Sequence, residues 1–312
     1  MKTRHSAAGG ALEAGRRILP AVMCVIAIAG ARAEEAAAPS SGVTTGHTYQ
    51  SPLDKRIEIE QMSQDNPFVL TSHKPTYLLP ISYNSRPNGA AVGEDGGDLD
   101  SIEMKFQISL KFSVWRHIFG DNGHLSLAYT QQAYWQAYNR EISSPFRETS
   151  HEPEAMLSFT TDFDLLGMRN RMLVFGFVHQ SNGQTEESSR SWNRLYANFI
   201  LERRNLVISF RPWYRFPEDA EDDDNPDIED YLGHGDLTLA YESERHVYSL
   251  LFRNNLKTGG DNHGAIQLDW SFPLKDRIKG YVQIFNGYGE SLIDYDRSVT
   301  RLGLGIMLND WL

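Results

Sequence analysis

The chain has 312 residues, and its 41 acidic against 30 basic side chains give a formal net charge of −11 at pH 7. An acidic balance of this size argues against nucleic acid as a partner. The single cysteine, Cys24, excludes an intrachain disulfide.

The first 33 residues have the layout of a secretory signal peptide. Basic residues between Lys2 and Arg17 precede an apolar run at 18–30, and Ala31-Arg32-Ala33 follows it. The run is shorter than the ~20 residues that a membrane-spanning helix needs, and no later apolar run is longer. We therefore expect cleavage before Glu34, which would leave an exported protein without cysteine.

Residues 34–65 are expected to form a flexible N-terminal leader. As far as about Ser51 the segment consists mainly of Ala, Ser, Thr and Gly and has neither a helical nor a strand period. The remaining residues, 66–312, suffice for one large β-domain, because closed β-architectures often exceed the average domain length.

A two-residue alternation is the dominant pattern from Tyr77 to the C-terminus. In its clearest case, segment 101–116, polar residues separate seven apolar ones: Ile102, Met104, Phe106, Ile108, Leu110, Phe112 and Val114. Soluble strands typically have about 5–6 residues, whereas tilted membrane-spanning strands need ~9–11. The length of this run therefore favours a membrane strand.

Similar segments recur along the chain and are joined by alternately short and long connections, which is the outer-membrane pattern. We expect strands near 75–84, 101–116, 123–138, 152–163, 170–182, 191–202, 204–216, 234–243, 246–256, 263–273, 277–289 and 298–311. The sequence thus predicts an all-β fold, a 12-stranded antiparallel transmembrane β-barrel of the bacterial outer membrane. A soluble periplasmic β-sandwich would also alternate, but it explains the long strands and the aromatic residues near strand ends less well.

Three polar residues interrupt the apolar faces of two successive segments. His179 and Ser181 continue the face of Phe177, and Asn193 begins the next apolar face. Serine becomes a useful nucleophile when an imidazole takes its proton and a third group orients that imidazole. We therefore interpret Ser181, His179 and Asn193 as nucleophile, base and orienter, with the backbone N–H of Gly183 as an oxyanion donor. Taken alone, a His-x-Ser pair is weak evidence and fits ordinary polar residues at a loop edge better than a catalytic site.

The surrounding residues resemble the active-site region of the outer membrane phospholipase A family. That region reads His-x-Ser-Asn-Gly followed by Ser-Arg-Ser-Trp-Asn-Arg-Leu-Tyr, and both halves stand intact at His179–Gly183 and Ser189–Tyr196. The resemblance extends from about Asn66 to the end of the chain. Further similar segments are 129–131, 143–149, 223–228, 287–295 and 307–310.

The resemblance implies a calcium-dependent, homodimeric enzyme that hydrolyses the acyl esters of phospholipids at either glycerol position, and of lysophospholipids. It assigns the same catalytic roles to the three residues above. Its calcium positions fall on Ser143 of one subunit and on Gln184 and Ser189 of the other, with Asp224 as a second calcium position. The family has an arginine where Gln184 stands; a backbone carbonyl ligand would survive that change, whereas a side-chain role would not.

Two further features remain open at the level of sequence. The acidic run 218–230 is either a calcium ligand segment or a solvated surface loop. Gln131 interrupts an apolar face, and the resemblance places it at the dimer interface, where two amides satisfy each other across a twofold axis; a bulge that turns it inward is the alternative. The competing function for the whole chain is a non-enzymatic barrel, a porin or solute channel.

Overall fold

The computed structural model describes residues 50–64, 69–89, 99–275 and 277–312. The predicted signal peptide, 1–33, and the first part of the predicted leader lie outside the described residues.

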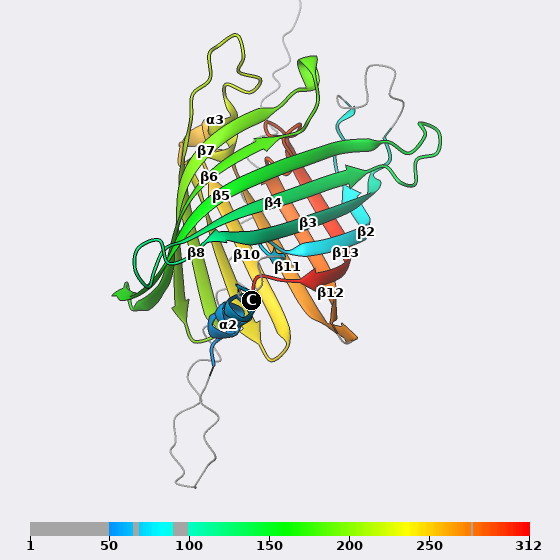
Figure 1. The fold of residues 1–312 in the computed structure, drawn as a ribbon. Helices are drawn as coiled ribbons and strands as arrows, with labels where there is room; N and C mark the ends of the chain where they lie inside the picture. Colours follow the sequence, from blue (N-terminus) through cyan, green and yellow to red (C-terminus); the bar gives the residue numbers. More distant parts are fainter. Residues whose placement is uncertain (1–49, 65–68, 90–98, 276) are drawn as a thin grey trace, which may run out of the picture. The chain divides into compact units, whose positions relative to one another are not determined.

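Twelve long antiparallel strands close into a barrel (Figure 1). Each strand pairs with its neighbours along the chain, and the last pairs with the first of the twelve, so the sheet has no free long edge. A two-residue strand, β1 (Thr71–Ser72), adds to β3. The twelve strands are β2 (Thr76–Asn84), β3 (Ile102–Trp115), β4 (His124–Trp135), β5 (Phe146–Leu165), β6 (Met168–Ser181), β7 (Ser191–Arg203), β8 (Leu206–Arg215), β9 (Gly235–Ser243), β10 (His246–Asn254), β11 (Gly264–Lys275), β12 (Ile278–Tyr288) and β13 (Ser298–Asn309). The predicted fold class is confirmed.

The two faces of the sheet have the polarity of a membrane barrel. On β3, Ile108 and Leu110 are 46% and 39% exposed on the outside, while Lys105 and Ser109 are buried inside. A soluble protein would place these side chains the other way round. The apolar outer band and polar interior are what a lipid-embedded barrel requires.

The barrel has one end with short turns and one with long loops. The hairpins β5–β6, β7–β8 and β9–β10 each turn within two residues, whereas 136–145, 182–190 and 216–234 connect strands at the opposite end. The short helix α3 (Ile228–Leu232) lies in the last of these long loops (Figure 1). In outer-membrane barrels the long loops are extracellular.

Near the long-loop end, the barrel interior is filled by an ionic cluster around Tyr134. Arg147 donates to Glu103 at 3.1 and 3.2 Å and to Asp294 at 2.8 Å, and Arg301 donates to Glu103 at 2.7 Å. Both guanidinium groups lie over the Tyr134 ring; the distance to the ring centroid is 5.0 Å for Arg147 and 4.9 Å for Arg301. These side chains are fully buried, and each charge needs its partners because an uncompensated buried charge is costly. The cluster lies on the inner side of the sheet at the long-loop ends of β3, β4 and β5.

A helix, α2 (Pro52–Gln64), lies at the short-turn end (Figure 1). Ser51 and Asp54 form a reciprocal cap at its start: the Asp54 N–H donates to Ser51 Oγ at 3.1 Å, and the Ser51 N–H donates to Asp54 Oδ2 at 3.2 Å. The expected flexible leader is therefore corrected over 52–64. The sequence signal was this cap, since the helix has no apolar stripe to reveal it.

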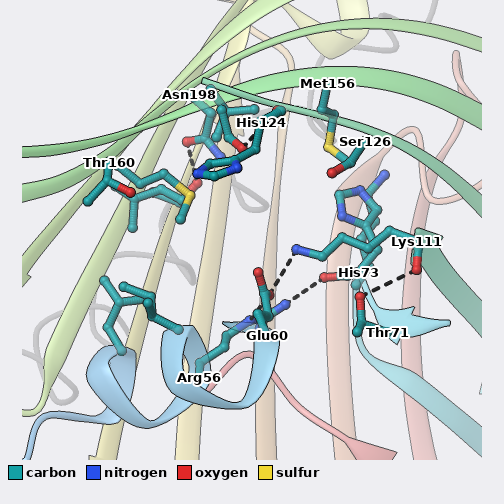
Figure 2. A pocket seen from close by; sticks show the side chains of 18 of the residues that line it. Arg56, Glu60, Thr71, His73, Lys111, His124, Ser126, Met156, Thr160 and Asn198 are labelled. Carbon is teal, nitrogen blue, oxygen red and sulfur yellow. Dashed lines mark hydrogen bonds and ion pairs between the residues drawn. The ribbon is translucent and has the colours of Figure 1, made fainter. Parts of the chain in front are cut away.

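Hydrogen bonds and ion pairs attach α2 to the barrel, and Leu53 of the helix is buried. Arg56 donates to the carbonyl oxygens of Trp311 at 2.6 Å and His73 at 2.9 Å, and Lys111 donates to Glu60 at 2.8 Å. These contacts bound a cavity of about 970 Å³ inside the barrel (Figure 2). The cavity is lined by inward-facing side chains, so it lies on the opposite side of the sheet from Ser181. No helix among the described residues is long and apolar enough to cross a membrane.

Candidate active site

The three predicted catalytic residues meet at the long-loop end of β6 and β7. His179 lies directly opposite Asn193 in the antiparallel register, and Ser181 lies opposite Ser191. They continue the outward face on which Phe177 is 44% exposed. The structure therefore brings these polar groups together on the outer surface of the barrel.

A hydrogen bond of 2.9 Å joins His179 Nδ1 to Asn193 Oδ1. An amide oxygen only accepts, so the proton of the imidazole lies on Nδ1 and the lone pair on Nε2. The Asn193 amide is itself oriented, because its Nδ2 donates to Glu218 Oε1 at 3.0 Å. This chain of bonds leaves His179 Nε2 as a proton acceptor.

Glu218 is a site residue that the sequence did not single out. It belongs to the acidic run, but nothing in the sequence indicates which carboxylate of that run reaches Asn193. The backbone makes the contact possible: the Phe216 N–H donates to the Asn193 carbonyl oxygen at 2.9 Å. The segment after β8 is thereby held beside the start of β7.

Ser181 is half-buried, two residues from His179 on the same face. Within the described chain, no hydrogen bond joins Ser181 Oγ to His179. Nucleophile and base often come into full contact only in the complex with substrate, so their shared face is the relevant arrangement. The backbone position of Ser181 is fixed by cross-strand pairing on both sides, with His151 on β5 and Ser191 on β7.

Asn182 fixes the loop that carries the predicted oxyanion donor. Its Oδ1 accepts from the N–H groups of Gln184 at 3.2 Å and Arg190 at 3.0 Å, and its Nδ2 donates to the Ser188 carbonyl oxygen at 2.8 Å. Gly183 follows with φ +66°, a conformation that favours glycine. The Gly183 backbone is therefore set by a buried amide, a role that the sequence did not reveal.

The structure brings together two of the four predicted calcium positions. Ser189 Oγ donates to Asp224 Oδ2 at 2.5 Å across two loops. Gln184 is exposed in the loop that contains Ser189, and Ser143 is exposed in the β4–β5 loop, with φ 63°. Among the described residues, no group of three or more His, Cys, Asp or Glu side chains could hold a metal ion. A calcium site here would have to use hydroxyl and carbonyl oxygens beside one carboxylate, and these hard donors suit calcium.

Much of the acidic run 218–230 makes specific contacts. Asp223 accepts from Arg215 at 2.6 Å, Asp227 accepts from the Tyr295 hydroxyl at 2.6 Å, and Asp230 accepts from Lys257 at 2.6 Å. Asp224 is the member that lies beside a predicted calcium residue. The run is thus neither a simple solvated face nor one acidic cluster.

Gln131 faces outward, in regular register between Ile108 on β3 and His151 on β5. The inward-turning bulge is not found at this position. Within the described part of the chain its amide makes no hydrogen bond, although it stands on the lipid-facing side. Such an amide lacks the partners that water would supply.

Comparison with known proteins gives one consistent result. The phospholipase A1 family model matches residues 53–308. Phospholipase A1 of Klebsiella pneumoniae is 41% identical over 248 residues, covering 79% of this chain and 84% of the relative, and that of Escherichia coli K12 is 39% identical over 270 residues, covering 86% and 91%. Outer membrane phospholipase A from Escherichia coli superposes with a TM-score of 0.73 at 38% identity, covering 78% of this chain and all of that chain. A dimer of the Salmonella typhi enzyme with bound calcium gives the same TM-score and identity, over 78% of this chain and 94% of that chain.

Proposed function

This chain belongs to the phospholipase A1 family and is a β-barrel of the bacterial outer membrane, and from this we propose that Ser181, His179 and Asn193 hydrolyse the acyl esters of glycerophospholipids at its outer surface. The proposal includes both ester positions and lysophospholipids, a requirement for calcium, and activation by dimerisation. The family resemblance seen in the sequence is confirmed.

The observation that carries the proposal is the bond between His179 Nδ1 and Asn193 Oδ1. It leaves the second imidazole nitrogen free to accept a proton on the face that Ser181 shares. This face is also the apolar exterior of the barrel, so an acyl chain of a neighbouring lipid reaches it without leaving the membrane. A neutral orienter suits this setting, because a carboxylate in an apolar environment would be costly.

The mechanism is acyl transfer. His179 Nε2 takes the proton of Ser181 as its oxygen attacks the ester carbonyl, and Gly183 N–H donates to the oxygen that becomes negative. His179 then gives the proton to the departing glyceryl oxygen. Water, deprotonated by the same imidazole, releases the fatty acid and restores Ser181.

We propose that Ser189, Asp224 and the carbonyl oxygen of Gln184 hold calcium, together with Ser143 of a second copy of the chain. The support is the direct contact between Ser189 and Asp224 and the oxygen-only chemistry of the set. When bound, the ion supplies positive charge beside the acyl-transfer site. The calcium-bound dimer of the Salmonella typhi enzyme is consistent with this proposal.

Release of fatty acid from a phospholipid in detergent micelles with calcium tests this function against a porin or solute channel. The proposal predicts steady release of fatty acid. A channel predicts stepwise ion conductance in a planar bilayer and no ester hydrolysis, and that combination would refute the enzymatic assignment.

We expect Glu218→Gln to lower kcat by about tenfold, which corresponds to about 1.4 kcal/mol in the barrier. A neutral amide holds the Asn193 Nδ2 less firmly than a carboxylate does, because hydrogen bonds to charged acceptors are stronger. Glu221→Gln, an exposed acid of the same run, is the matched control and should keep its activity. Equal kcat for both variants would remove Glu218 from the site.

We propose that the outward amide of Gln131 pairs with its counterpart in the dimer. Gln131→Ala should lower the yield of calcium-dependent chemical crosslinks by several fold, because one side-chain hydrogen bond between membrane-embedded segments contributes about 0.6–2 kcal/mol. The control is Ile284→Ala, an exposed residue on β12. Undiminished crosslinking of Gln131→Ala would contradict the amide pairing.

A further inference from the structure

A second histidine, His151, lies beside Ser181 on the outer face. The register pairs His151 with Gln131 on β4 and with Ser181 on β6. Directly opposite residues in antiparallel strands have Cβ atoms about 4.5–5.5 Å apart. Ser181 is therefore approached by two imidazoles, His179 along its own strand and His151 from the neighbouring strand.

The ring of His151 faces the predicted oxyanion donor. A Cβ atom built on Gly183 would lie 3.6 Å from His151 Cδ2 and 3.7 Å from its Nε2. The Cδ2–Nε2 edge of the imidazole thus borders the space beside Gly183. This edge therefore lies close to the residue whose N–H is proposed to stabilise the negative charge that develops on the ester oxygen.

The hydrogen-bond network gives the two imidazoles opposite tautomers. The Tyr129 hydroxyl lies 2.6 Å from His151 Nδ1, and the two rings stack at 6.2 Å between centroids. A phenol O–H is a stronger acid than a neutral imidazole N–H, so Tyr129 donates and the His151 proton lies on Nε2. His179 is the reverse case, since Asn193 Oδ1 holds its proton on Nδ1. One histidine therefore presents an acceptor to the site, and the other presents a donor.

We propose that His151 is a further catalytic residue, whose Nε2–H stabilises the negative oxygen formed when Ser181 attacks the ester. This inference rests on the proposed function. The Ser181 proton passes to His179, the Oγ–carbon bond forms, and the carbonyl electron pair moves to the oxygen, which accepts from Gly183 N–H and His151 Nε2–H. When the carbonyl re-forms, the bond to the glyceryl oxygen breaks and that oxygen takes the proton from His179. His151 keeps its own proton throughout.

The test compares His151→Phe, which keeps a ring but lacks the donor, with His151→Gln, whose side-chain N–H stands at a similar distance from the backbone. Kinetics on phospholipid micelles with calcium should show kcat lowered by about 10²-fold in His151→Phe, with KM changed by less than about twofold. His151→Gln should recover most of that loss. His246→Phe, an outer-face histidine on β10 that stacks on Trp270, should match the wild type.

An unchanged kcat in His151→Phe, an effect confined to KM, or a His151→Gln variant as slow as His151→Phe would overturn the role of His151. Heat-modifiable migration in gels checks that each variant keeps its barrel. The results can refute the proposed function and the role of His151 independently of each other. Ser181→Ala with wild-type activity would overturn the proposed function, whereas an inactive Ser181→Ala beside a fully active His151→Phe would overturn only the role of His151.

Discussion

Replacing Ser181 with alanine should abolish ester hydrolysis, with kcat falling by about 10⁴- to 10⁶-fold. The reason is covalent: without Oγ no acyl-enzyme forms, and the proton acceptor on His179 has no nucleophile to activate. Residual hydrolysis should come only from water placed by the remaining groups. The measurement is fatty acid release from phospholipid micelles at saturating calcium.

The matched control for this variant is Ser191→Ala. Ser191 lies directly opposite Ser181 on β7, so it has the same side chain on the same outer face but belongs to the neighbouring strand. We expect Ser191→Ala to stay within about threefold of the wild type, as is usual for substitutions that remove no needed contact. Near-wild-type activity of Ser181→Ala would contradict the nucleophile assignment.

Removal of calcium by a chelator should lower activity by at least about 10²-fold, which is the effect of losing one charge-stabilising contact at an oxyanion. Added calcium should restore activity, and magnesium should not, because the smaller ion demands octahedral geometry and holds its water more tightly. Release of fatty acid is measured as the free calcium concentration is varied.

The residue that connects this requirement to the chain is Asp224, which accepts a hydrogen bond from Ser189. Asp224→Asn should raise the calcium concentration for half-maximal activity by about tenfold, since a carboxylate is a stronger ligand for a hard cation than an amide. Asp222→Asn, an exposed neighbour, should leave it unchanged. Full activity in chelator, or identical calcium curves for both variants, would refute this site.

The barrel was predictable because one local rule governs most of it. Alternation with period two identified the strands, and the observed bounds lie close to the expected segments. The clear exception is β5, expected from 152 but starting at Phe146. Pro153 interrupts the pattern there, and Glu152 and Pro153 do not pair with β6. The polar run at 147–152 shows no apolar alternation, so His151 was expected in a loop.

The parts of the site that escaped prediction depend on contacts between distant segments. His179 and Asn193 could be paired because His179 lies near the end of β6 and Asn193 near the start of β7, and one loop joins these strands. Glu218 lies beyond another strand and a turn, and only the folded backbone brings it to Asn193. The helix α2 was missed for a different reason: many of its contacts with the barrel are polar, such as the ion pair of Lys111 with Glu60, and they leave no clear hydrophobic period in the sequence.

The most direct test of a lipid-facing catalytic serine is to locate the covalent adduct of a long-chain alkyl fluorophosphonate by mass spectrometry of the calcium-loaded protein. We predict modification of Ser181, together with loss of activity in proportion to labelling. An adduct on another residue, or full inactivation without modification of Ser181, would contradict it.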